Sequence, residues 1–200
     1  MITQVKNGLN KNFKLLRKKA FPYKPLEVLG PEHEFSLVDE ELRPLPISDQ
    51  VIKDYLGRIA DFVYLPMAIF GKEAALLQME IKAKTPFKSP ETFEETIQDT
   101  VTTLLEFIGK KHKAHLLGTG MHPTLTLEET DMWPHSNQDT IQELKNIFNL
   151  KRQGYLNIQS FQLNLPYSNE ANAVSMYNTL THLCAYLPAL SASSPGTPGA

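Results

Sequence analysis

Alternating apolar and polar residues predict a half-buried β-strand over residues 28–38. One face of this strand carries Leu29, His33, Phe35 and Leu37. Glu32 and Glu34 lie on the other face, about 7 Å apart at the usual rise per residue. Like charges this close raise each other's pKa, so such a pair commonly holds a cation or shares a proton. A solvated strand face is the alternative interpretation.

Three further segments have the pattern of strands. Residues 74–84 alternate between an apolar face and a polar face that carries Gln78 and Glu80. Residues 115–122 are strand-like, and residues 156–166 form the last predicted strand. On that strand Gln162 and Asn164 face the same way, either as amides that bind a ligand or as ordinary surface amides.

Apolar residues at helical spacing predict helices over residues 5–20, 48–59, 89–113, 139–150 and 168–187. The last of these is expected to direct its apolar stripe inward, namely Ala173, Val174, Tyr177, Leu180 and Leu183. Because each strand has one apolar and one polar face, we predict an α+β fold with a curved, largely antiparallel sheet. The polar faces would line a cavity, and helices would cover the outer face.

Composition and charge narrow the classes of function. The 200 residues include 20 Lys and Arg against 22 Asp and Glu, a net charge of -2 that gives no general attraction to nucleic acid or to an anionic membrane. No apolar run has the length of a membrane span, and the N-terminus lacks the apolar core of a signal peptide, so we expect a cytoplasmic protein. The single cysteine, Cys184, excludes an intrachain disulfide and is expected to lie in the core.

Four segments occur together in a particular order. They are Gly30-Pro31-Glu32-His33-Glu34-Phe35, Leu77-Gln78-Met79-Glu80 with Thr85-Pro86, Gly118-Thr119-Gly120-Met121-His122-Pro123, and residues 187–195. Their order and spacing resemble the carboxylate–amine ligase family that includes the type-2 glutamate–cysteine ligases. The fold of that family resembles the catalytic barrel of glutamine synthetase, so the resemblance implies part of such a barrel here.

The resemblance also implies a reaction, ATP-dependent amide formation as used in glutathione biosynthesis. The terminal phosphoryl group of ATP passes to the side-chain carboxylate of glutamate, and the amine of cysteine or a similar compound then displaces phosphate. Mg²⁺ would be the cofactor, held by Glu32, Glu34 and Glu80, with Glu32 and Glu34 at the reaction centre. The residues expected to bind ATP or substrate are Gln78, His122, Gln162 and Asn164.

Two features depart from the family pattern. Many relatives carry His-x-His where this chain has Gln162-Leu163-Asn164. His122 keeps its family position, and two roles remain open for it: contact with ATP or substrate, or packing with hydrogen bonds inside the protein. The family also continues beyond the residues present here. We therefore expect a basic N-terminal helix and linker in residues 1–25, the N-terminal part of a ligase-like domain in residues 26–195, and a disordered Gly/Pro tail in residues 196–200.

The short length leaves several alternatives open. A homo-oligomer or a second chain would complete the barrel. Without that completion, the chain would be a ligase-like binding domain that does not catalyse the reaction. A metal-dependent phosphoester hydrolase that uses Glu32, Glu34 and Glu80 is a third alternative.

Overall fold

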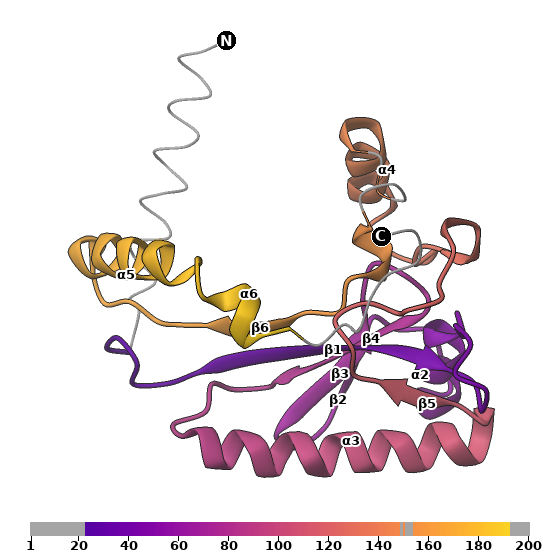
Figure 1. Ribbon diagram of the computed structural model, residues 1–200. Helices are drawn as coiled ribbons and strands as arrows, with labels where there is room; N and C mark the ends of the chain where they lie inside the picture. Colours follow the sequence, from indigo (N-terminus) through magenta and orange to yellow (C-terminus); the bar gives the residue numbers. More distant parts are fainter. Residues whose placement is uncertain (1–22, 149, 151–153, 193–200) are drawn as a thin grey trace.

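An antiparallel sheet of six strands forms the centre of the protein (Figure 1). This computed structural model describes residues 23–148, 150 and 154–192. The strands are β1 (Gly30–Val38), β2 (Phe62–Tyr64), β3 (Ala68–Lys72), β4 (Gln78–Ala83), β5 (His115–Leu117) and β6 (Phe161–Asn164). Their order is β2-β3-β4-β1-β5, and β6 also pairs with β1. Every strand pair is antiparallel, which confirms an α+β fold with an antiparallel sheet.

Strand β1 organises this sheet. It pairs with β4 along Glu32–Ser36 on one side. On its other side, β6 pairs with the first half of β1 and β5 with the second half. Segments that lie more than 100 residues apart in the sequence therefore meet on one strand.

The main core fills the space between one face of the sheet and two helices, α2 (Ser48–Leu56) and α3 (Pro90–His112). Ser89 caps α3 by accepting a hydrogen bond from the backbone N–H of Thr92, and Pro90 stands at the first helical position, as the sequence predicts. Helix α3 runs along the sheet in Figure 1. The buried core residues are Phe35, Leu37, Val51, Ile52, Val63, Phe70, Met79, Ile81, Leu104, Ile108, Ala114 and Trp133. These helices confirm that one face of the sheet is covered.

The hairpin of β2 and β3 was not predicted from the sequence. Pro66 lies in its turn, and the hairpin extends the sheet beyond β4. Gly71 of β3 lies opposite Glu80 of β4. A Cβ atom at Gly71 would collide with the backbone oxygen of Asp61, so glycine permits this close approach beside the carboxylate.

All four predicted strands are shorter in the structure than in the prediction, β1 by two residues at its start and β5 by five residues at its end. Strand β4 begins at Gln78 because the preceding residues turn, with the N–H of Gln78 donating to the carbonyl of Ala75 at 3.0 Å. The last strand is limited to β6, and a 3₁₀ turn, Tyr155–Asn157, occupies the start of the predicted range. A second 3₁₀ turn spans Leu127–Glu129.

The C-terminal helices contradict the predicted burial. These are α4 (Gln138–Ile147), α5 (Glu170–Leu183) and α6 (Leu187–Leu190), and none of them contains a buried residue. The predicted inward stripe of α5 is wrong, since Val174, Tyr177, Leu180 and Leu183 are all exposed. Cys184 is also exposed rather than in the core. In Figure 1, α5 and α6 lie on the opposite side of the sheet from α3.

The predicted helix over residues 5–20 and the predicted tail over residues 196–200 lie outside the described residues. Within the described part of the chain, no helix combines the length and the apolar character needed to cross a membrane.

A candidate metal centre on the polar face of the sheet

Two carboxylates face each other across the central strand pair. Glu34 of β1 lies directly opposite Glu80 of β4, and both side chains are buried. Their neighbours Phe35 and Met79, also paired, point to the core on the other face. Period-two alternation therefore places both carboxylates on the face away from α3, as the sequence predicts.

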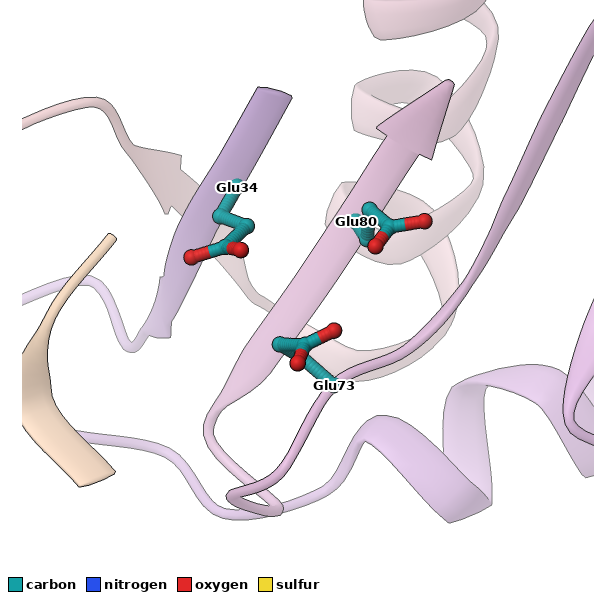
Figure 2. Close-up of side chains that lie close together, drawn as sticks. All are labelled: Glu34, Glu73 and Glu80. Atoms are coloured by element: carbon teal, nitrogen blue, oxygen red, sulfur yellow. The ribbon is translucent and has the colours of Figure 1, made fainter. Parts of the chain in front are cut away.

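A third carboxylate joins them from the connection between β3 and β4. Figure 2 shows Glu73 on this connection, next to Glu34 and Glu80. One carboxylate oxygen from each of the three residues lies within 4.8 Å of the others. We call Glu34, Glu73 and Glu80 the carboxylate cluster. Glu73 was not predicted from the sequence as a site residue, because it precedes the alternating residues 74–84.

Mutual repulsion and burial raise the pKa of Glu73 to about 7. Burial is the largest cause, followed by the negative charges of Glu34 and Glu80, while Lys72 acts in the opposite direction. The nearby Glu80 side chain raises this pKa a second time, because only a protonated Glu73 can donate a hydrogen bond to it. Near neutral pH, and without a cation, the cluster therefore retains a proton for part of the time.

The C-terminal strand fixes the orientation of Glu34. The backbone N–H of Ser160 donates to Oε2 of Glu34 at 2.9 Å, and the amide Nε2 of Gln162 donates to Oε1 at 2.8 Å. The same Nε2 contacts the Ser160 hydroxyl at 3.1 Å. Both carboxylate oxygens of Glu34 thus have a donor, which holds the side chain in one position.

Glu80 is less completely satisfied. Its Oε1 is buried and accepts no hydrogen bond, although the ammonium group of Lys82 forms an ion pair with it. A buried carboxylate oxygen without a hydrogen-bond donor is costly unless a cation compensates it. In this structure the ammonium group of Lys82 is that cation, so a metal ion at Glu80 would have to replace it.

A cavity of about 180 Å³ adjoins the cluster. Its lining residues include Glu34, Glu73, Gln78, Tyr155, Ser160 and Gln162. Gln78 accepts a hydrogen bond from the N–H of Ala75 at 3.0 Å and donates to the carbonyl of Ile158 at 2.7 Å. The structure thus gives Gln78 a bracing role between the strand and residue 158, at the wall of the cavity.

Glu32 and Asn164 lie beside the cluster and outside it. Asn164 donates through Nδ2 to Oε1 of Glu32 at 2.7 Å and to the carbonyl of Gly30 at 2.9 Å. Glu32 is partly exposed and does not join the group of oxygens formed by the other three glutamates. Of the three carboxylates that the resemblance implies as ligands, the structure brings together Glu34 and Glu80.

His122 is fully buried and hydrogen-bonded within the protein. Its Nδ1 accepts from the N–H of Thr124 at 3.3 Å, so Nε2 carries the proton that is donated to the carbonyl of Leu42 at 3.1 Å. Burial lowers the pKa of His122, which favours this neutral tautomer. His122 does not line the cavity beside the cluster, so the structure matches the packed alternative considered above.

The donor set of the cluster fits magnesium. Mg²⁺ prefers hard oxygen ligands and is bound in proteins by carboxylates together with water and phosphate oxygens. The cluster offers only carboxylate oxygens, and no Cys or His lies among them. Fold and site together define a class of protein, an α+β domain whose sheet carries a cluster of carboxylate oxygens of the kind that suits a divalent cation.

Comparison with known proteins identifies the family. Residues 28–200 match the model of glutamate–cysteine ligase family 2. This match covers more than half of the chain. The chain is also 43% identical, over 169 residues, to an uncharacterized protein of Archaeoglobus fulgidus. That match covers 84% of this chain and 45% of the relative, so the chain spans less than half of the relative's length. The chain belongs to glutamate–cysteine ligase family 2.

Proposed function

We propose that the chain acts in an ATP- and Mg²⁺-dependent ligase reaction that joins the side-chain carboxylate of glutamate to an amine. The amine of cysteine or a similar compound would displace phosphate from an acyl phosphate. Membership of glutamate–cysteine ligase family 2 supports the ligase class. The meeting of Glu34, Glu73 and Glu80 within 4.8 Å is the observation that carries the assignment to this face of the sheet.

The cluster has a clear task in such a reaction. A negatively charged carboxylate must approach a highly charged triphosphate, and Mg²⁺ on the phosphate oxygens offsets that repulsion. Glu34, Glu73 and Glu80 would hold the ion. Ser160 and Gln162 would keep Glu34 oriented, and the adjoining cavity would admit the phosphate end of the nucleotide.

Isothermal titration of ATP into the 200-residue chain, first with Mg²⁺ and then with excess chelator, tests this proposal. We expect binding that requires Mg²⁺. Glu80→Gln should weaken this binding by about tenfold or more, because it removes a charged ligand. Glu32→Gln is the matched control, and we expect it to bind as the unaltered chain does. Binding that survives in Glu80→Gln, or that fails in Glu32→Gln alone, would contradict the assignment of ligands.

Turnover assays separate this reaction from two alternatives. The ligase requires both glutamate and an amine for phosphate release, whereas a metal-dependent phosphoester hydrolase would release phosphate without an amine. The second alternative is a binding domain that lacks catalysis until another chain or a second copy completes a glutamine synthetase-like barrel. The exposed apolar side chains of α5 and α6 favour this alternative, because they suggest a surface that a partner covers.

A further inference from the structure

Lys82 occupies a distinctive position next to the carboxylate cluster. It follows Glu80 by two residues on β4, so its side chain lies on the same face of the sheet. Its ammonium group forms the ion pair with Oε1 of Glu80 and lies 4.3 Å from the centre of the Phe62 ring. An anion on one side and an aromatic face on the other therefore hold this cation in place.

The two side chains of this ion pair differ in their exposure to solvent, and so in their ability to change conformation. The side chain of Glu80 is 6% exposed, whereas that of Lys82 is 26% exposed. Lysine has a long, flexible stem, and Lys82 is therefore the partner that can move.

A divalent cation on the cluster would compete with Lys82 for Glu80. The ion would bind the oxygen that Lys82 now neutralises, and its two positive charges would repel the ammonium group. The Phe62 ring and the position on β4 keep the displaced ammonium close to the cluster. Two kinds of partner would then lie near it, Glu32, which stands opposite Lys82 on β1 and already accepts a hydrogen bond from Asn164, and an anionic group that the metal itself binds.

Lys84 and Lys72, the neighbouring lysines, do not form an ion pair with a glutamate of the cluster in the described part of the chain. Lys84 lies beyond the end of β4 and donates to the carbonyl of Leu65 at 3.2 Å. Lys72 pairs with Met79, a core residue, and its ammonium group lies 5.9 Å from the centre of the Trp133 ring. Lys72 acts on Glu73 only as a nearby charge, whereas Lys82 forms an ion pair with a member of the cluster.

We propose that Lys82 is a transferable counter-ion, which neutralises Glu80 in the metal-free chain and binds a phosphoryl oxygen of the nucleotide once the metal occupies Glu80. This inference rests on the proposed function, because it requires a metal-bound nucleotide at the cluster. It makes Lys82 a substrate-binding residue that neither the sequence motifs nor the family assignment indicate. An ammonium group is a suitable partner for phosphate because it is a compact point charge.

The proposal predicts opposite effects of one substitution on two affinities. Lys82→Met keeps the length of the side chain and removes its charge. We expect Mn²⁺, measured alone by the paramagnetic resonance signal of the free ion, to bind about threefold more tightly, because its competitor is gone. ATP, titrated into the Mn²⁺-saturated chain, should bind about tenfold more weakly, because a hydrogen bond to a charged group is lost. Lys82→Arg should remain near the unaltered chain in both measurements, and Lys84→Met is the matched control.

Each contrary outcome has a distinct meaning. Weaker binding of Mn²⁺ as well as ATP in Lys82→Met would show that Lys82 only supports the local structure. If Lys82→Met binds ATP as tightly as the unaltered chain does, the contact between Lys82 and phosphate is overturned. It is also overturned if Lys82→Met binds glutamate more weakly but ATP equally well. If the unaltered chain binds Mn²⁺ but no ATP, the transfer of Lys82 is overturned while the metal site stands. If the unaltered chain binds no Mn²⁺, the proposed function fails, and the role of Lys82 fails with it.

Discussion

Helices α3 and α5 both have apolar residues at helical spacing, but most of those of α3 pack in the core and most of those of α5 are exposed. Helix α3 places Leu104 and Ile108 against the sheet, and both are fully buried. Helix α5 has an apolar stripe of its own, yet Leu180 and Leu183 are 43% and 45% exposed. A stripe at helical spacing thus indicates which face of a helix seeks a partner, and the surrounding fold decides whether that partner is present.

The carboxylate cluster lies at the junction between these two regions. Glu34 and Glu80 belong to the strands that pack on α3, whereas Ser160 and Gln162 belong to the segment that leads to α5. The buried region fixes where the carboxylates lie, and the exposed region fixes how Glu34 is oriented. Substitutions in the two regions should therefore have different consequences.

The largest difference should appear in stability. Leu104→Ala leaves a cavity in the core and should lower the free energy of unfolding by about 2–5 kcal/mol. Leu180→Ala on α5 should change it by less than about 0.5 kcal/mol, because the side chain keeps much of its contact with water. Urea denaturation of the two variants measures both values. Equal losses would mean that α5 is covered in solution, and the contrast between the helices would then fail.

The cluster should make stability depend on pH in metal-free buffer. The pKa of Glu73 is about 7 in the folded chain and 4.5 when unperturbed, so the folded state binds more protons between these values. Stability should therefore fall as pH rises from about 4.5 to 7, by on the order of 2–3 kcal/mol. Glu73→Gln should remove most of this slope, and saturating Mg²⁺ should do the same by neutralising the cluster. Urea denaturation at several pH values measures the effect, and an unchanged slope in Glu73→Gln would refute it.

The exposed region should affect metal binding through Gln162. Gln162→Leu removes the amide that donates to Glu34 while it retains similar volume, and we expect Mn²⁺ to bind about tenfold more weakly. Asn164→Leu is the control, since Asn164 donates to Glu32 outside the cluster. A similar loss in both variants would indicate that β6 acts only by pairing with β1. Calorimetric titration of Mn²⁺ provides the comparison.

The smallest effect concerns Cys184, which follows α5 and is exposed. Its thiol should react with an alkylating reagent in the native chain at a rate within about threefold of that in the unfolded chain, because it needs no opening of the fold. Strong protection that increases with protein concentration would show that a second copy covers this region. Mass spectrometry of the labelled chain over time gives the rate.

The local pattern of the sequence was enough to predict the facing of the strand residues and the start of the longest helix. Alternation in residues 28–38 and 74–84 placed Glu34 and Glu80 on a polar face and Phe35 and Met79 in the core, because successive side chains in a strand point to opposite faces. Ser89 and Pro90 marked the start of α3 through equally local chemistry. These features depend only on residues a few positions apart.

Tertiary structure alone decided the composition of the site and the exposure of α5. Glu73 joins the cluster because the turn between β3 and β4 brings it to Glu34 and Glu80. Glu32 stays outside because strand register places it opposite Lys82, where Asn164 of β6 donates to it. A periodic pattern fixes the direction of a side chain relative to its own strand or helix. Strand register, loop paths and covering partners depend on contacts between distant residues, which a local pattern does not encode.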